Sequence, residues 1–289
     1  MKKRVGILLI AAMCLSLAAC GGSDTTEETN AMTERAEEDG AAEDSTATAE
    51  DSVTTLKEGV LQVGMEIGYP PMEYLDADGV TPIGFDVDVA YALGEKLGLE
   101  VELVDTAWDG IFAALDTEKY DCVISSVSSS EERKAKYNLT EAYIANRLVV
   151  VVAKGSDIAA LEDLDGKIVA VQAETTSDYY AQEVQAGGVG MELAQYEQVI
   201  NAFDELKVGR ADAVLTDSVV ASYYLGDDAD DYQIVWEEEA GEPLGICLKK
   251  GNDDLTKAIE AAIDAMYEDG TMLEIAKTHF GVDNIDTLR

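Results

Sequence analysis

A segment near the middle of the chain has the residue types of a small anion site. The apolar run at residues 122–124 predicts a buried strand, serines dominate residues 125–130, and two glutamates and Arg133 follow. A helix that begins after such a strand offers backbone N–H groups without intrahelical partners, and serine hydroxyls add further donors. An arginine guanidinium can bind a carboxylate through two parallel hydrogen bonds. The alternative interpretation is a serine-rich helix cap beside a surface arginine.

The N-terminus has the pattern of a bacterial lipoprotein leader. Lys2, Lys3 and Arg4 form a positive region, and the apolar stretch at residues 5–17 is too short to span a membrane. The sequence Leu-Ala-Ala-Cys-Gly-Gly at residues 17–22 resembles the lipobox, in which small residues precede the lipidated cysteine. We predict a signal peptide at residues 1–19 and a lipid on Cys20 that anchors the protein to the outer face of the cell membrane. The alternative is a secretory signal that is cleaved without lipidation.

Residues 20–52 lack the composition of a folded domain. Acidic residues, Ser, Thr and Ala dominate, aromatic residues are absent and Arg35 is the only base. There is little apolar surface to bury, and the acids repel one another, so we predict a disordered, extended acidic tether.

The composition excludes several kinds of function. The net charge of −39 and a pI near 4.1 argue against nucleic-acid binding, because no basic patch is dense enough to neutralise phosphates. Cys122 and Cys247 lie in apolar strand-like runs and are expected to be buried thiols, although an extracytoplasmic location permits a disulfide. The single His279 has no second His or reactive thiol placed beside it, so we expect no metal and no cofactor.

Strand-like and helical segments alternate from residue 60 onwards. Strands are predicted at residues 60–64, 101–104, 122–126, 148–153, 168–171, 213–216 and 246–249, and helices at residues 85–97, 111–115, 177–184, 199–208, 219–225 and 255–267. This alternation favours an α/β fold with parallel sheets covered by helices, here in two lobes around a cleft. Ligands of such sheets bind beyond the carboxyl ends of the strands, where residues 126–130, 172–176 and 216–217 would converge.

Short motifs occur in a fixed order along residues 63–281. They include Tyr-Pro-Pro-Met-Glu-Tyr at 69–74, Gly-Phe-Asp-Val-Asp at 84–88, Trp-Asp-Gly-Ile at 108–111, Ser-Glu-Glu-Arg at 130–133 and Gly-Arg-Ala-Asp-Ala-Val at 209–214. Each motif is weak alone, but the ordered set resembles the substrate-binding lipoproteins of amino-acid ABC importers, the polar amino-acid solute-binding family.

The resemblance implies a type II periplasmic-binding-protein fold, with two parallel-sheet lobes joined by two hinge strands near residues 143–149 and 242–246. Lobe 1 would comprise residues 56–144 and 245–289, and lobe 2 residues 145–244. Ligand binding would close the cleft between the lobes. The protein would be a monomer without enzymatic activity that captures an L-amino acid and delivers it to a membrane permease and its ATPase.

The resemblance also assigns a carboxylate-binding half of the site. Arg133 would bind the ligand α-carboxylate, assisted by Ser128 and by the backbone N–H groups of Thr175 and Thr176. Glu174 departs from the family pattern, which usually has glycine at this position. An acid there is unfavourable for an anion unless it points away from the ligand or meets a ligand cation.

The remaining roles concern the ammonium group and the ligand side chain. Asp217 would accept the α-ammonium together with the Ser126 carbonyl, and Tyr69 and Trp108 would enclose the ligand. Gln172 and Glu66 occupy positions that often contact the ligand side chain. The alternatives are that Tyr69 and Trp108 are core aromatics, that Asp217 caps the following helix, and that Glu66 is a rim residue in contact with water.

The predicted charge balance favours a polar or cationic ligand. Arg133 and Asp217 together neutralise a zwitterion, which leaves Glu66, and Glu174 if it faces the pocket, to repel an anionic side chain. We therefore expect glutamine, arginine, lysine or cystine rather than glutamate or aspartate. Two other functions remain open: a dehydratase acting on cyclohexadienyl or arogenate substrates with Glu66 or Glu174 as its acid or base, and a ligand-sensing module for a membrane receptor.

Overall fold

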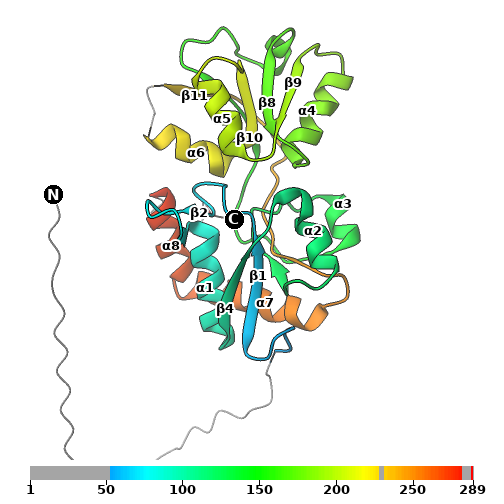
Figure 1. Ribbon diagram of the computed structural model, residues 1–289, viewed down its shortest axis with the longest axis vertical. Helices are drawn as coiled ribbons and strands as arrows, with labels where there is room; N and C mark the ends of the chain where they lie inside the picture. The colour runs from blue at the N-terminus through cyan, green and yellow to red at the C-terminus, as the bar shows by residue number, and fades with distance from the viewer. Residues whose placement is uncertain (1–52, 228–230, 282–287, 289) are drawn as a thin grey trace, which may run out of the picture. The chain divides into compact units, whose positions relative to one another are not determined.

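The computed structural model describes residues 53–227, 231–281 and 288 (Figure 1). The predicted signal peptide, Cys20 and the acidic tether lie outside the described residues. No helix in the described part of the chain is both long and apolar enough to cross a membrane. Two five-stranded sheets and a two-stranded ribbon, β2 (Tyr74–Leu75) with β3 (Pro82–Ile83), form the folded unit.

The first sheet has the strand order β4-β1-β5-β12-β6. Its strands are β1 (Val60–Met65), β4 (Glu100–Asp105), β5 (Cys122–Val123), β6 (Asn138–Leu139) and β12 (Cys247–Leu248). Both β4 and β5 run parallel to β1, whereas β12 is antiparallel to its two neighbours. Segments that are far apart in the sequence therefore complete one sheet.

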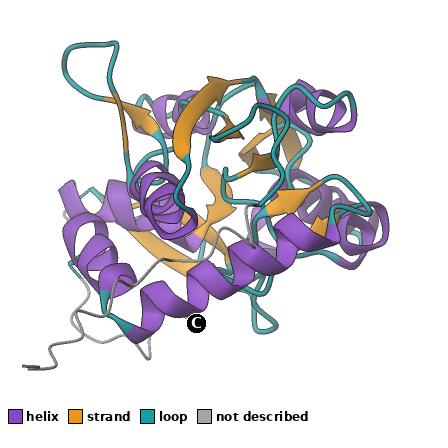
Figure 2. Cartoon of the chain, turned by 90° about the horizontal axis from the view of Figure 1, so that it is seen from below, coloured by secondary structure: helices purple, strands orange, loops and turns teal. Residues whose placement is uncertain are grey.

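Helices cover both faces of this sheet (Figure 2). One group consists of α1 (Phe85–Leu97), α7 (Asp253–Glu268) and α8 (Thr271–Phe280), which contact one another. The other is α2 (Trp108–Asp116), followed later by the short α3 (Glu131–Lys136). Buried Phe85, Val89 and Leu93 are spaced by about one helical turn along α1 and so form one apolar face. The helix ends at Gly98, whose left-handed φ of 68° is favourable only for glycine.

The second sheet has the strand order β11-β7-β10-β8-β9. Its strands are β7 (Leu148–Ala153), β8 (Ile168–Gln172), β9 (Glu192–Tyr196), β10 (Ala213–Asp217) and β11 (Tyr232–Glu237). Along β7, Leu148, Val150 and Val152 pack in one apolar cluster, while the intervening Val149 and Val151 pack in another. Both faces of this interior strand are therefore buried, as expected for a sheet with helices on both sides.

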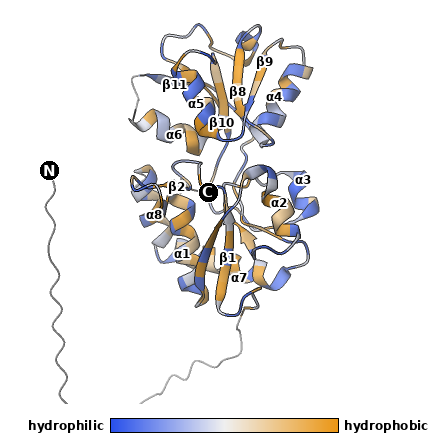
Figure 3. Ribbon diagram, viewed as in Figure 1, coloured by the Kyte–Doolittle hydropathy of each residue, from blue (hydrophilic) through white to orange (hydrophobic). Residues whose placement is uncertain are grey.

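The helical elements around the second sheet are η1 (Leu161–Leu164), α4 (Thr176–Ala186), α5 (Val199–Lys207) and α6 (Ser218–Asp227). In Figure 3 the apolar colour concentrates on the strands, and the hydrophilic colour is common on the helices that surround them. The α/β fold class predicted from the sequence is confirmed.

Neither sheet is wholly parallel, which corrects part of the prediction. Strands β1, β5, β8 and β10 end at the region between the sheets, where Glu66, Ser125, Gln172 and Asp217 lie. The strand β7 begins in that region and leads away from it, and so does β12. These two strands therefore pair antiparallel with β10 and β5.

Several short or polar elements were not predicted. The sequence pattern did not indicate the edge strands β9 and β11, the ribbon of β2 and β3, the strand β6 or the helix α8. The strand expected at residues 122–126 is only two residues long. The exposure pattern of β9 alternates imperfectly between exposed and half-buried residues, so its sequence carries a weak period-2 signal.

Two chain segments cross between the sheets side by side. Ile144 and Leu244 form an isolated bridge, in which the Leu244 amide donates to the Ile144 carbonyl at 2.9 Å. The Tyr143 amide donates to Leu244 O at 2.9 Å, and the Glu242 amide donates to Asn146 O at 2.8 Å. We propose these crossings as the hinge and as the boundaries between lobe 1 (residues 56–144 and 245–289) and lobe 2 (residues 145–244).

Cys122 and Cys247 are free, buried thiols on the paired strands β5 and β12. Burial raises the pKa of both thiols, that of Cys247 to about 12. The expectation of buried thiols is confirmed, and with their pKa raised these groups remain protonated and unreactive.

Candidate functional site

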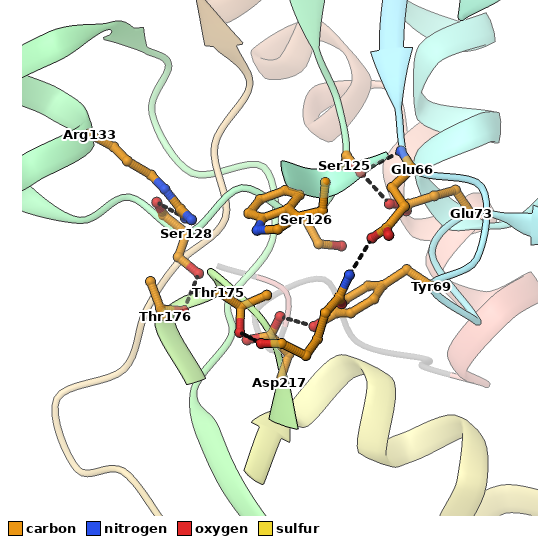
Figure 4. A pocket seen from close by; sticks show the side chains of 12 residues that line it. Glu66, Tyr69, Glu73, Ser125, Ser126, Ser128, Arg133, Thr175, Thr176 and Asp217 are labelled. Carbon is orange, nitrogen blue, oxygen red and sulfur yellow. Dashed lines mark hydrogen bonds between the residues drawn. The ribbon is translucent and has the colours of Figure 1, made fainter. Parts of the chain in front are cut away.

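A small cavity lies between the two sheets, beyond the carboxyl ends of their strands. All ten residues that the sequence analysis proposed as ligand contacts line it, and Glu73 and Ser125 line it as well (Figure 4). The residues from the first sheet and its loops are Glu66, Tyr69, Glu73, Trp108, Ser125, Ser126, Ser128 and Arg133. Those from the second are Gln172, Thr175, Thr176 and Asp217.

Arg133 provides the only positive charge among the side chains that line this cavity. Its guanidinium lies 5.2 Å from the ring centroids of both Trp108 and Phe112. One nitrogen, Nη1, donates to Ser128 O at 3.1 Å. The aromatic rings restrict the guanidinium, and its other N–H groups can bind a carboxylate.

Hydroxyl and backbone groups surround the arginine. Ser130 caps α3 and accepts from the Arg133 amide at 3.3 Å, which fixes the start of this short helix. Ser128 Oγ lies 3.3 Å from Thr176 Oγ1, so the two hydroxyls meet across the cleft. Thr175 caps α4, where the first N–H groups of the helix are available to an anion.

Asp217 provides an acceptor on the other sheet. It is 5 % exposed and accepts hydrogen bonds from Tyr69 Oη at 2.6 Å and from Asn146 Nδ2 at 2.7 Å. These contacts hold the carboxylate at the wall of the cavity, and Asp217 also directly precedes α6, so its role as a ligand acceptor and the alternative role as a helix cap both stay predictions. Burial raises the pKa of Asp217 to about 6, although both hydrogen bonds lower it.

Glu66 and Gln172 meet at the far end of the cavity. Gln172 Nε2 donates to Glu66 Oε2 at 2.7 Å and to the Glu197 carbonyl at 3.0 Å. Glu66 is 5 % exposed, so the expectation of a rim residue in contact with water is wrong. The second sheet covers this side chain, and the resulting desolvation raises the pKa of Glu66 to about 7.

The cleft is closed by direct contacts between its two walls. The Tyr69–Asp217, Gln172–Glu66 and Ser128–Thr176 contacts each join the two sheets, and Trp108 Nε1 donates to Glu174 O at 3.0 Å. Tyr69 and Trp108 are buried and also line the cavity, so they are not simply core aromatics. Each aromatic side chain reaches from the first lobe to a group on the second.

Glu174 has a left-handed backbone with φ of 62°, which explains why glycine is expected at this position. Its amide donates to Asp178 Oδ2 at 2.9 Å, and its carbonyl accepts from Trp108. The Glu174 side chain is exposed and lines an outer cleft that shares Trp108, Arg133 and Thr176 with the inner cavity. The acid therefore lies outside the inner cavity, in a cleft that Arg133 also lines.

The backbone at Glu174 is expected to cost stability. Glu174→Gly and Glu174→Ala both remove the carboxylate, but only glycine adopts a positive φ without steric cost. We expect the glycine variant to have a free energy of unfolding about 1 kcal/mol higher than the alanine variant. Urea denaturation of the two ligand-free variants measures the difference, and an alanine variant as stable as the glycine variant would contradict a strained backbone.

Sequence reasoning missed three residues of the site and its support. Ser125 Oγ donates to Glu73 Oε1 at 2.6 Å and accepts from the Glu66 amide at 3.0 Å. Glu73 was recognised only as part of the motif at residues 69–74, and Ser125 only as one hydroxyl in a serine-rich run. Asn146 lies in the first crossing segment and has no sequence signal, because its role depends on Asp217 being beside it.

His279 contacts two side chains of α1. Its Nε2 lies 2.6 Å from Asp88 Oδ2, and its ring packs edge-on against Phe85. Within the described residues, no group of three or more His, Cys, Asp or Glu side chains could hold a metal ion.

The model of the bacterial extracellular solute-binding proteins, family 3, matches residues 61–282. The chain belongs to this family. The match covers both sheets, both crossing segments and every residue that lines the cavity. The two-lobed architecture and the extracytoplasmic class of protein follow from this membership.

Named relatives are binding proteins. The L-cystine-binding protein TcyJ of Escherichia coli is 36 % identical over 228 residues, which are 78 % of this chain and 84 % of the relative. The L-arginine-binding protein of Pseudomonas aeruginosa is 32 % identical over 231 residues, 77 % and 88 % of the two chains. The structure of an ancestral arginine-binding protein bound to arginine has a TM-score of 0.73, is 40 % identical, and covers 77 % of this chain and 99 % of its own. The family supports a binding protein rather than an enzyme.

Proposed function

We propose that this solute-binding protein captures a cationic L-amino acid, with L-arginine as the leading ligand, for an ABC importer. The observation that supports the proposal is that three charged side chains line one cavity. Arg133 and Asp217 complement the α-carboxylate and the α-ammonium of an amino acid, and Glu66 is left to contact the ligand side chain. An unpaired charge in a buried site is strongly unfavourable, so the ligand has to supply a positive group for Glu66.

The assigned roles follow the cavity. Arg133, Ser128 and the amides of Thr175 and Thr176 bind the α-carboxylate, while Asp217 and the Ser126 carbonyl bind the α-ammonium. Tyr69 and Trp108 cover the ligand, which excludes water and strengthens the charged hydrogen bonds. Glu66 and Gln172 bind the cationic side chain. This assignment is supported by the shared lining of one cavity and by the resemblance stated above.

The charge on the cavity distinguishes the ligands considered. Burial, followed by the charge of Asp86, raises the pKa of Glu73 well above its usual range and so favours its neutral form, and we assign the ligand cation to Glu66. Arginine and lysine carry that cation. Glutamine carries no charge, and cystine brings a second carboxylate together with its second ammonium. The names of relatives include both cystine- and arginine-binding proteins, which keeps cystine as the second candidate.

A ligand screen tests the proposal. Ligand that binds only the folded state raises stability by about 2.7 kcal/mol at a concentration a hundredfold above Kd. Thermal unfolding with each of the standard L-amino acids and L-cystine should give the largest rise in Tm with L-arginine, followed by calorimetry for Kd. A large shift with L-glutamate and none with L-arginine would overturn the assignment of Glu66.

The cellular context is proposed from the sequence and the family. We propose that Cys20 carries the lipid that holds a monomeric protein on the outer face of the membrane, and that a permease with its ATPase receives the ligand. Mass spectrometry of the N-terminal peptide of the mature protein tests the anchor. A mature chain that begins at Cys20 without a lipid mass would contradict it.

A further inference from the structure

Ser126 has a backbone conformation that serine rarely adopts. Its φ is 49°, in the left-handed region, and the residue is 6 % exposed in the wall of the cavity. A non-glycine residue in this region is strained and persists only when its surroundings hold it. The residue that holds Ser126 in this conformation does not itself line the cavity.

Asp86 accepts directly from the strained residue. The Ser126 amide donates to Asp86 Oδ2 at 2.8 Å, and Ser126 Oγ lies 3.4 Å from the same oxygen. Asp86 is fully buried in the first turn of α1, where the helix N-terminus favours a negative charge. The carboxylate is therefore held rigidly behind the loop that carries Ser126.

The same carboxylate reaches the crossing segment. Tyr143 Oη donates to Asp86 at 2.8 Å and 3.0 Å from its two oxygens. Tyr143 is fully buried and stacks on Phe85 with 6.2 Å between ring centroids, and its backbone amide donates to Leu244 on the second crossing segment. One side chain thus connects the ligand-binding loop to the place where both chain segments cross.

We propose that Asp86 is a positioning residue that holds Ser126 in its left-handed conformation, orients the Ser126 carbonyl for the ligand ammonium, and links this loop to the hinge through Tyr143. The role of the carbonyl rests on the function proposed above. Asp86 itself does not line the cavity, so its effect on binding is transmitted through Ser126 and Tyr143.

Asparagine is the informative replacement for Asp86. In Asp86→Asn, the amide N–H group faces either the Ser126 amide, which can only donate, or the Tyr143 hydroxyl, which must then accept instead of donating. The remaining oxygen is neutral and accepts the Ser126 N–H group more weakly than a carboxylate does. Hydrogen exchange of the Ser126 amide in ligand-free protein should become at least tenfold faster, while the Val123 amide keeps its rate. Calorimetry should show Kd for L-arginine at least tenfold weaker.

A second replacement distinguishes a positioning role of Asp86 from a general loss of fold stability in Asp86→Asn. Glycine adopts a positive φ without steric cost, so Ser126→Gly removes the need for Asp86 to hold the backbone. We expect Asp86→Asn to weaken L-arginine binding by less than threefold when it is introduced into Ser126→Gly, compared with at least tenfold in the parent. A loss of affinity that comes only from a damaged fold would be as large in both backgrounds.

If Asp86→Asn does not fold, Tyr143→Phe provides a second test of the contact between Asp86 and Tyr143. The phenyl ring can keep the stacking on Phe85, and only the hydroxyl is lost. We expect Ser126 exchange to become severalfold faster and Kd for L-arginine to become three- to tenfold weaker. Unchanged Ser126 exchange in both variants would overturn the inference even if L-arginine failed to bind the parent protein, whereas that failure alone would contradict only the proposed ligand.

Discussion

Arg133→Ala is expected to weaken L-arginine binding by between about a hundredfold and about five-thousandfold. The substitution leaves the ligand carboxylate buried without its charged partner, and breaking a buried pair in this way costs about 3–5 kcal/mol. Calorimetry measures Kd, and thermal unfolding measures the lost ligand-induced rise in Tm. In the ligand-free protein the Arg133 guanidinium lies over Trp108 and Phe112 and donates to Ser128 O, contacts that contribute about 1 kcal/mol each, so the ligand-free Tm should fall by only a few degrees.

Two further variants serve as controls for Arg133→Ala, one for the loss of positive charge and one for the geometry of the guanidinium. Lys136→Ala removes a positive charge from the same helix, but its side chain is exposed and pairs with Glu132, so Kd should change less than twofold. Arg133→Lys keeps the charge without the paired N–H geometry and should give an intermediate Kd. A ligand-free Arg133→Ala protein that no longer folds would show that Arg133 is structural.

L-Arginine binding should also weaken sharply as the pH falls. Glu66 has a pKa of about 7 and Asp217 of about 6 in the ligand-free protein, and the proposed ligand cations require both to be ionised. Affinity is therefore complete at pH 8 and above and is lost as the pH falls through each pKa. Kd should rise about tenfold between pH 7 and pH 6 and about a further fiftyfold between pH 6 and pH 5.

Glu66→Gln tests which carboxyl group causes the first part of this dependence. In this variant Kd for L-arginine at pH 8 should be at least tenfold weaker, and the dependence between pH 8 and pH 6.5 should become flat. Glu174→Gln removes the same charge from the outer cleft and should keep the parent profile within about threefold. A Glu66→Gln protein with the parent pH profile would exclude Glu66 as the partner of the ligand side chain.

The sequence predicts which residues line the cavity because the cavity lies at strand ends. Tyr69, Trp108, Arg133 and Asp217 belong to segments whose hydrophobic pattern changes abruptly to polar residues, and an α/β fold brings such ends together. The strong periodicity of α1 similarly predicted its bounds, because an apolar face and a terminal glycine both mark them.

The environment of individual side chains could not be predicted in the same way. Glu66 is buried because a segment more than a hundred residues later, at Gln172, covers it. The role of Asp86 depends on the amide of Ser126 and on the hydroxyl of Tyr143, which approach it only in the folded chain. Antiparallel β7 and β12 likewise depend on where the chain crosses between lobes, which local periodicity does not encode.

The pairing of Tyr69 with Asp217 and of Gln172 with Glu66 has a consequence for selectivity. An arriving solute competes with groups that already satisfy one another, so its net gain is the difference between the new contacts and the ones it displaces. A solute that replaces only some of the displaced hydrogen bonds leaves buried polar atoms without a partner. Such a molecule is rejected by the unpaired groups it leaves behind, even when it is small enough to enter.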